Sequence, residues 1–426
     1  MSARLSRRQF VQSAAAVSLA GPVILSRPAL GAPAGDRVNI GFIGVGTQGR
    51  GHVNRLVSQP DVQVVAISDV VVERANAAKE IVEKKYADAA KSGEYKGCAT
   101  YNDFRDLLAR KDIDAVVIAT PDHWHALSCV AAANSGKDIY CEKPLTHTIA
   151  QGQKIIDAVR KNNIVFQTGS QQRSEFGGRF RQAVDYVRNG RIGKVKTVRV
   201  GVGGPAIACD LPDETAPEGT DWNLWLGPAA SRGYNEILCP KGIHRGFPQW
   251  RRYKEYAAGA LADMGAHHFD IAQWALNADG TAPVEIQPPA SGETGLRFVY
   301  ANGIEMFHGG PSGCTFEGSE GTIYVDRSKL ESTPAKILEE PLTEKDQRVY
   351  FSDNHFRNWL DCLRSRKDPI CTAEIGARSA EICHLGNIGY WLRRPLKWNP
   401  DAHKFVGDDE ANKLLDYTMR SPWRLA

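Results

Sequence analysis

The sequence lacks the features that mark several specialised protein classes. Its 426 residues include nine cysteines but no C-x-x-C pair, so neither a disulfide framework nor a zinc site is expected. Beyond the N-terminus no run of about 20 apolar residues occurs, so we expect no membrane-spanning helix. The net charge is only +4, with basic residues scattered among acidic ones, and nucleic acid is therefore not an expected partner.

The first 35 residues have the order of a bacterial export signal. The motif S-R-R-Q-F-V at residues 6–11 contains twin arginines, an apolar stretch follows up to Leu25, and small residues surround Gly31 and Pro33. A chance pair of arginines before a short helix is the alternative. We predict a twin-arginine signal peptide at residues 1–35 and export to the periplasm.

The rest of the composition is typical of a globular protein. Hydrophobic residues make up 42% and charged residues 24% of the chain, which is long enough for two domains. Cys209 and Cys239 lie in a loop-rich region and could pair after export. Cys129 and Cys141 lie in apolar segments and are expected in the core.

The hydrophobic pattern changes once along the chain. Up to residue 166, short apolar runs alternate with helical patterns, which predicts βαβ units and a parallel sheet whose strands end at one edge. The expected strands are 38–44, 62–68, 114–119, 138–141 and 164–166, and the expected helices include 74–92 and 103–110. Beyond residue 193 we expect strands at 194–202, 296–301, 304–308 and 321–325, a loop-rich stretch at 204–258, and helices at 260–276, 353–365, 373–392 and 409–420.

These patterns predict an α/β protein of two domains. Residues 36–160 are expected to form a Rossmann dinucleotide-binding domain. Residues 161–426 are expected to form an α/β domain with a large, mostly antiparallel open sheet, and its C-terminal helices could pack back on the first domain.

A glycine-rich turn follows the first predicted strand. The segment Gly44-Val45-Gly46-Thr47-Gln48-Gly49 fits G-x-G-x-x-G and precedes a helical segment. Gly44 would allow the tight turn, Gly46 the approach of a pyrophosphate, and Gly49 the close packing of helix and strand. Thr47 and Gln48 belong to the same turn and are expected to contact the cofactor.

An acidic residue ends the second predicted strand. Asp69 lies twenty residues after Gly49, where a carboxylate can accept hydrogen bonds from the adenosine ribose and would repel a 2′-phosphate. We therefore expect NAD rather than NADP. A glycine turn with a helix-capping Asp69 is the alternative, and Arg74 is expected to be a solvated helix residue.

Two short motifs follow the third and fourth predicted strands. They are Thr120-Pro121-Asp122-His123-Trp124-His125 and Glu142-Lys143-Pro144. With them the chain resembles, from Val38 to its C-terminus, the Gfo/Idh/MocA family, which is named for glucose–fructose oxidoreductase and inositol dehydrogenase. The segment W-N-L-W-L-G-P at 222–228 is similar to one in exported members. The resemblance implies NAD-dependent oxidoreductase activity and an open sheet that forms dimers or tetramers.

The resemblance also implies roles for these strand-end residues. The lysine of E-K-P, here Lys143, acts in the substrate pocket, where it could pass a proton to or from the reacting oxygen. Thr120, Pro121, His125, Glu142 and Lys143 itself are expected near the cofactor. A surface charge is the alternative for Lys143, and a capping role is the alternative for His125.

A further set of polar residues lies in the predicted helix 260–276. Asp263, His267 and Asp270 have the spacing of one helix face, so Asp263 could orient the imidazole of His267 and favour its protonated form. In the family an Asp-x-x-x-His pair on this helix faces the substrate, which makes His267 the candidate base and Asp263 a substrate ligand. A capping Asp263 and a core His267 are the alternatives. A metal site that adds His268 is not expected, because adjacent helical side chains point about 100° apart.

Other candidates rest on residue type alone. Arg173 follows the fifth predicted strand and could bind a hydroxylated or acidic ligand, as could Tyr256, one of several aromatic residues that would suit a sugar ring or the core. The others are Trp222, Trp225, Trp250 and Tyr253. Arg251 and Arg252 could select an anionic sugar.

The leading hypothesis is hydride transfer between NAD and a secondary hydroxyl of a sugar, cyclitol or glycoside. Free NAD should be scarce outside the cytoplasm, so an exported enzyme is expected to hold its cofactor tightly. A NAD-dependent glycoside hydrolase or lyase acting through transient 3-keto oxidation is the alternative. A non-catalytic sugar-binding protein is the third hypothesis.

Overall fold

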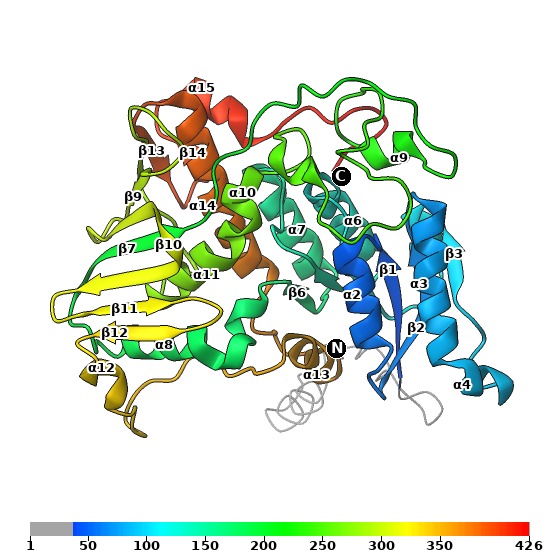
Figure 1. Ribbon diagram of the computed structural model, residues 1–426, viewed down its shortest axis with the longest axis horizontal. Helices are drawn as coiled ribbons and strands as arrows, with labels where there is room; N and C mark the ends of the chain where they lie inside the picture. Colours follow the sequence, from blue (N-terminus) through cyan, green and yellow to red (C-terminus); the bar gives the residue numbers. More distant parts are fainter. Residues whose placement is uncertain (1–36, 426) are drawn as a thin grey trace, which may run out of the picture.

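The computed structural model describes residues 37–425, and the predicted signal peptide lies outside them. Two sheets lie at opposite ends of the molecule, a parallel one of six strands and an antiparallel one of eight (Figure 1). Within residues 37–425, no helix is both long enough and apolar enough to cross a bilayer.

The first sheet is a Rossmann-type parallel sheet. Its strands are β1 (Val38–Ile43), β2 (Val62–Ser68), β3 (Ala99–Tyr101), β4 (Ala115–Ile118), β5 (Asp138–Cys141) and β6 (Phe166–Thr168), in the order β3-β2-β1-β4-β5-β6. The order reverses between β1 and β4, which is where ligands bind in such sheets. Strands β4 and β5 are buried throughout because helices cover both faces. The sheet ends at Thr168, beyond the expected domain boundary at residue 160.

The helices of this domain are α2 (Thr47–Leu56), α3 (Val72–Lys85), α4 (Ala87–Lys91), α5 (Phe104–Leu108), α6 (Asp122–Asn134) and α7 (Ile149–Lys161). The helix expected at 74–92 is two helices, because the chain leaves the helical conformation at Tyr86. Helix α2 begins at Thr47, so the last three residues of the predicted glycine-rich segment 44–49 already form its first turn.

The second sheet is antiparallel. Its strands are β7 (Val195–Gly201), β8 (Glu285–Gln287), β9 (Arg297–Val299), β10 (Glu305–Gly318), β11 (Thr322–Val325), β12 (Leu330–Thr333), β13 (Leu396–Asn399) and β14 (Lys404–Phe405). Strand β10 continues well past the expected 304–308, because the glycines at 309, 310 and 313 form an irregular part of the strand paired with β7. Helices α8 (Arg179–Arg188), α11 (Gly265–Ala275) and α14 (Ala373–Leu392) pack with this domain.

The C-terminal region connects the two domains. Helix α13 (His355–Ser365) places Phe356, Trp359 and Leu360 in the core of the first domain. The prediction of a helix at 409–420 is confirmed only for its first residues and is wrong for the rest. Helix α15 (Asp409–Asn412) and one 3₁₀ turn are followed by an irregular tail, because Met419, Trp423 and Leu425 pack instead on the first domain. A short α12 (Lys336–Glu339) precedes α13.

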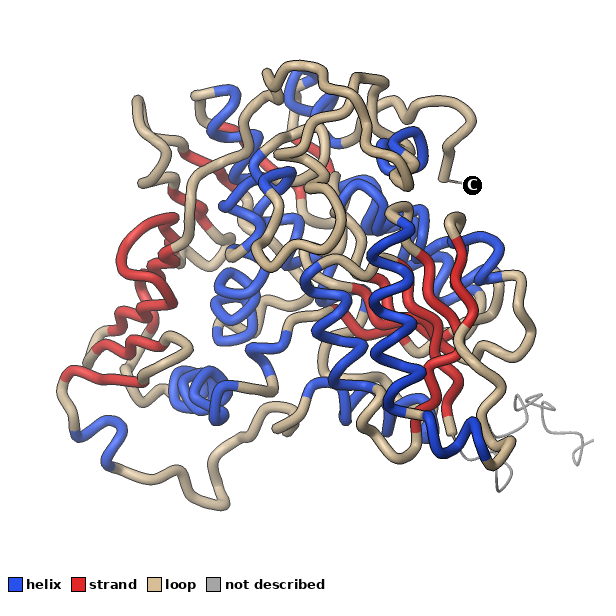
Figure 2. Tube along the Cα trace, turned by 45° about the vertical axis from the view of Figure 1, so that its right-hand side comes forward, coloured by secondary structure: helices blue, strands red, loops and turns tan. Residues whose placement is uncertain are grey.

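The loop-rich stretch 204–258 lies along the carboxyl edge of the parallel sheet (Figures 1 and 2). It contains α9 (Trp222–Leu226) and leads to α10 (Gly259–Asp263). The aromatic residues singled out in the sequence form a small core of their own, with Trp225, Trp250, Tyr253 and Tyr256 buried. Cys209 and Cys239, whose pairing the sequence left open, are both free thiols in the structure, and Arg232 donates a hydrogen bond to the Cys209 sulfur.

Candidate active site

The glycine turn has the geometry that a dinucleotide requires. Gly44 has a φ of 83°, and a Cβ there would collide with the backbone at Ala119. A Cβ on Gly49 would collide with the carbonyl oxygen of Gly44. At Gly46 a Cβ would meet nothing within 4 Å, and this residue lines a cleft. Gly44 and Gly49 are therefore required by packing, whereas Gly46 leaves room for a ligand.

Asp69 stabilises this turn. Its Oδ2 accepts a hydrogen bond of 2.8 Å from the amide of Val45, and its Oδ1 accepts one of 2.9 Å from the amide of Val71. A carboxylate has further lone pairs, and Asp69 lines the cleft, so it can still accept ribose hydroxyls. The predicted cofactor residues that line this cleft are Gly44, Gly46, Thr47, Gln48, Asp69, Thr120 and Pro121. Backbone amides at the start of α2, the carboxylate of Asp69 and the open space beside Gly46 fit NAD.

A loop covers the same cleft, and we call residues 240–248 the strap. Arg50 donates a hydrogen bond of 2.6 Å to the carbonyl of His244 in the strap, and the hydroxyl of Thr47 donates one of 2.8 Å to Gly246. Arg74 donates one of 2.9 Å to Gly242 and another to Pro240. The expectation that Arg74 is solvated is therefore wrong: the side chain is buried because the strap carbonyls bind its guanidinium.

A second cavity of about 370 Å³ adjoins the cleft. Gln48, Thr120 and Arg251 line both spaces. Lys143 enters the cavity from the end of β5, and Asp263 and His267 enter it from α10 and α11. The structure therefore brings the two motifs together at the carboxyl edge of the parallel sheet, in a cavity large enough for a sugar.

Lys143 and Asp263 form the central ion pair of this cavity. Lys143 Nζ donates hydrogen bonds of 2.8 Å to Asp263 Oδ1 and 2.7 Å to the Asp263 carbonyl. That carbonyl is available because α10 ends at Asp263 and α11 begins only at Gly265. Burial opposes ionisation of Asp263, but Lys143 and Arg251 hold the pKa of the carboxyl below its usual value.

His267 differs from the sequence-based expectation. The helix break and the pairing of Asp263 with Lys143 leave the imidazole of His267 without the carboxylate that was expected to favour its protonated form. Burial, followed by the positive charges of Lys143 and Arg327, instead lowers the pKa of His267 well below its usual value. The ring is neutral at pH 7, and its buried Nδ1 has no hydrogen-bond partner.

Glu142 lies beside Lys143 in sequence but has other side-chain partners. Its Oε1 lies 2.7 Å from His52 Nε2 and accepts a hydrogen bond of 2.9 Å from Gln171. Burial opposes its ionisation, yet these contacts and the charges of His52 and Lys143 lower the pKa of Glu142 to about 2. The carboxylate is thus fixed in the wall of the cavity.

Two predicted ligand residues lie behind the walls of the site. His125 is buried, with Nδ1 at 2.7 Å from the Pro144 carbonyl and Nε2 at 3.0 Å from the Thr120 carbonyl, so it joins the loops after β4 and β5. Tyr256 is 1% exposed and packs its ring against His123 and Trp225. Neither residue lines the cleft or the cavity. The expectation that His125 contacts the cofactor and Tyr256 the substrate is therefore corrected, because both side chains lie in the core.

Asp122 and Arg327 are among the lining residues that were not predicted as site residues. Asp122, at the start of α6, is 5% exposed, and burial followed by the nearby Asp263 raises its pKa well above the usual value. Arg327 lies in the turn between β11 and β12. Asp122 belongs to the Thr120–His125 motif and could have been found there. Arg327 has no local sequence signal, because only the packing of the second sheet brings it to the cavity.

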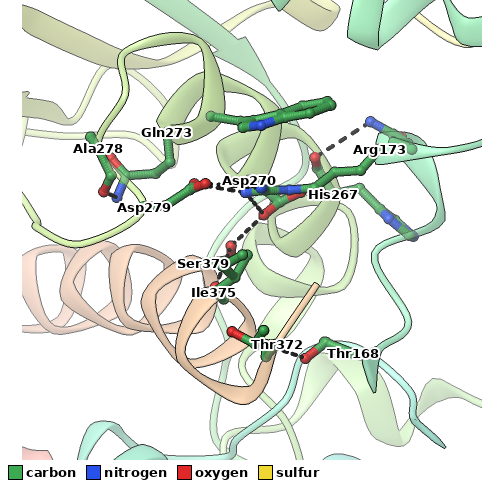
Figure 3. Close-up of polar contacts among 12 residues, drawn as sticks. Thr168, Arg173, His267, Asp270, Gln273, Ala278, Asp279, Thr372, Ile375 and Ser379 are labelled. Carbon is green, nitrogen blue, oxygen red and sulfur yellow. Dashed lines mark hydrogen bonds and ion pairs between the residues drawn. The ribbon is translucent and has the colours of Figure 1, made fainter. Parts of the chain in front are cut away.

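Arg173, the remaining predicted ligand residue, has a structural role instead. Figure 3 shows its guanidinium facing the carboxylates of Asp270 and Asp279, with Ser379 donating to Asp270. Arg173 donates to Asp270 at 2.8 and 2.7 Å and to Asp279 at 2.9 and 2.7 Å. The side chain is 1% exposed and its guanidinium lies over the ring of Trp274. Its donors are occupied by protein carboxylates, which corrects the expectation of a substrate contact.

Removal of Arg173 should therefore affect stability. We expect Arg173→Met to lower the free energy of unfolding by about 3–5 kcal/mol, because Asp270 would be left buried without a counter-charge. Denaturant unfolding measures this loss. The double variant Arg173→Met/Asp270→Asn should regain part of it, and an unchanged midpoint in the single variant would contradict the structural role.

Comparisons with known proteins agree with this architecture. Residues 38–170 match the NAD-binding Rossmann fold of an oxidoreductase family, and residues 206–425 match the C-terminal alpha/beta domain of the same family. A levoglucosan dehydrogenase solved with NADH and levoglucosan superposes with a TM-score of 0.55 at 19% identity, covering 85% of this chain and 99% of that one. This likeness concerns the fold.

Sequence relatives include inositol dehydrogenases. Inositol 2-dehydrogenase of Salmonella typhimurium is 37% identical over 180 residues, which are 42% of this chain and 48% of that protein, so the match spans about half the relative. Myo-inositol 2-dehydrogenase of Thermotoga maritima is 24% identical over 380 residues, covering 84% of this chain and 96% of that protein. The match of both domains shows that the chain belongs to the Gfo/Idh/MocA family of oxidoreductases, with an NAD-binding Rossmann domain at its N-terminal end.

Proposed function

We propose that the protein is an NAD-dependent oxidoreductase that acts on a secondary hydroxyl of a sugar, cyclitol or glycoside. The observation that carries this proposal is the Lys143–Asp263 ion pair beside neutral His267, in a cavity that adjoins the cleft at Gly46. The relatives named for myo-inositol and levoglucosan support the substrate class.

The cavity residues can manage the proton of the reacting hydroxyl. Bound NAD would supply the chemistry of accepting a hydride from the carbinol carbon, or returning it. The ammonium of Lys143 would donate a hydrogen bond to the reacting oxygen and stabilise negative charge there, and Asp263 holds that ammonium in place. His267 is unprotonated at neutral pH, so a ring nitrogen can accept the hydroxyl proton.

The test uses the protein as purified. Mass spectrometry of the native protein should find NAD, and addition of myo-inositol, levoglucosan or common aldoses should produce NADH absorbance with at least one of them. A preparation that contains NAD but reduces it with no polyol would argue against the proposal. Release of a free aglycone from a glycoside, with no net NADH, would favour the hydrolase or lyase alternative.

The strap supports the tight retention of NAD. It lies over the glycine turn through Thr47, Arg50 and Arg74, so we infer that the cofactor leaves only when these contacts open. Arg74→Gln should speed NAD release by about ten- to a hundredfold, since a charged donor to buried carbonyls is worth about 1.5–3 kcal/mol. Lys85→Gln, an exposed change on the same helix, is the control. Release measured by filtration of the holoenzyme at equal rates in both variants would show that the strap does not retain the cofactor.

We also infer export by the twin-arginine route, supported by the motif at residues 6–11. Export in the folded state would carry NAD loaded in the cytoplasm, which fits a slowly exchanging cofactor. N-terminal sequencing of the protein from a periplasmic fraction tests this inference. A chain that begins at Met1 and stays in the cytoplasm would contradict it.

A further inference from the structure

The cavity contains more charged residues than its own ion pairs satisfy. Three contacts pair six of the lining residues: Lys143 with Asp263 at 2.8 Å, Arg55 with Glu175 at 2.8 Å, and His52 with Glu142 at 2.7 Å, the last being an ion pair only when His52 is protonated. The other charged residues that line the cavity are Asp122, Arg251 and Arg327. The charge of the space left for a substrate therefore depends on these three residues.

Arg327 is held in position but has no counter-charge. Its Nε donates a hydrogen bond of 3.0 Å to the side-chain oxygen of Gln172, and its guanidinium lies 4.8 Å from the ring centre of Phe176. No carboxylate of residues 37–425 comes within ion-pair distance of it, and no acceptor there binds its Nη groups. These two contacts thus fix the guanidinium group of Arg327, and its Nη donors are available to bind a ligand.

Arg251 adds positive charge on another wall of the cavity. Its Nε lies 3.7 Å from Asp263 Oδ1, which already accepts a hydrogen bond from Lys143. Its guanidinium lies 4.1 Å from the ring centre of Trp250. Burial lowers the pKa of both Arg251 and Arg327, and the negative charge of Asp263 opposes this effect only in part.

Asp122 does not cancel this excess. Burial and the nearby carboxylate of Asp263 raise its pKa well above the usual value, which favours the neutral carboxylic acid. Asp263 is the carboxylate that lies beside both Lys143 and Arg251, whereas Arg327 forms no ion pair with a carboxylate of the described residues. The cavity is therefore short of negative charge beside the residues that would manage the hydroxyl proton.

We propose that the substrate is an anionic sugar, whose carboxylate or phosphate group binds to the Nη donors of Arg327 while a secondary hydroxyl lies at Lys143 and His267. The inference rests on the proposed function and narrows its substrate class. A planar guanidinium with free Nη donors suits both kinds of oxyanion, because it can donate two parallel hydrogen bonds.

The test compares ligands that share one carbon skeleton. The NAD-loaded protein is titrated calorimetrically with D-glucose, D-glucuronate and D-glucose 6-phosphate, and then with the corresponding galactose series. We expect at least one acid to bind about ten- to a hundredfold more tightly than its neutral parent, as expected for hydrogen bonds between charged groups. The preferred member of each series tells whether the group is a carboxylate or a phosphate.

Two variants test whether Arg327 is responsible for the preference for an acidic ligand. Arg327→Met keeps an apolar stem but removes the guanidinium group, and it should abolish the preference for the acid. Arg199→Met is the matched control, because Arg199 also stacks on a phenylalanine of the second sheet, Phe307, but pairs with Glu317 and does not line the cavity. It should leave binding unchanged.

The outcomes separate this inference from the proposed function. Equal affinity for neutral and acidic members of both series, or a preference that survives in Arg327→Met, overturns the anionic substrate, whereas NADH formation from a neutral polyol would still support the oxidoreductase. Conversely, Arg327-dependent binding of an acid without any reduction of bound NAD would support the anion site and contradict the proposed reaction.

Discussion

Replacement of Lys143 by methionine should lower kcat by about 10²–10⁴-fold, the range in which a positioned proton-transfer group contributes. Methionine nearly fills the same space but removes the ammonium that donates to Asp263 and would donate to the reacting oxygen. NAD should stay bound, because the glycine turn and Asp69 are untouched. The measurement is kcat with the best substrate, together with the NAD content of each preparation.

A second variant distinguishes chemistry from packing. Lys143→Arg keeps a positive charge near Asp263 but cannot place a single ammonium at the same point, so it should also be strongly impaired while folding normally. If Lys143→Met retained turnover within a few fold of the unchanged protein, Lys143 would have no part in the reaction.

Acidification should unfold the protein at an unusually high pH. Burial lowers the pKa of His123 and His384 to about 3 and of His147 and His355 to about 4. In the unfolded chain each would titrate near pH 6.5, so each costs about 1.4 kcal/mol per pH unit below that value. At pH 5 these four histidines together lower the free energy of unfolding by roughly 8 kcal/mol, which is comparable to the whole stability of a typical domain.

The sign of this effect follows from proton binding. A buried neutral histidine binds its proton only when the chain unfolds, so stability is complete above about pH 6.5 and is lost as the pH falls toward the folded-state pKa. Glu142 and Asp61, with pKa values of about 2, add losses in the same direction only at lower pH. Asp122 and Asp270 act in the opposite direction because their pKa values are raised.

Denaturant unfolding at pH 7.5, 6.5 and 5.5 measures this dependence. The variant His384→Asn should show a smaller difference between neutral and acidic pH, whatever its stability at pH 7.5, because one proton-binding group is gone. A free energy of unfolding that stays constant between pH 7.5 and 5.5 would show that these histidines do not titrate as the structure requires.

Local sequence determined the nucleotide cleft. The glycine turn and Asp69 come directly after a strand and Lys143 lies two residues after one, and parallel strands bring their carboxyl ends to one edge of the sheet. Once the strands were located, the placement of these residues followed from the backbone alone. The roles of Lys143, Asp263 and His267 in the reaction remain predictions.

Only the tertiary structure decided which charges are free for a ligand. Arg173 and Arg327 are both arginines without a local motif, yet Arg173 is neutralised by Asp270 and Asp279, which lie 97 and 106 residues further along the chain. Arg74 binds carbonyls of a strap more than 160 residues away. Asp263 pairs with Lys143 and not with His267, because the helix breaks between Asp263 and His267. The physical reason is common to all these cases: an ionic group's role is set by its burial and by its counter-charge, and both come from segments that only folding brings near.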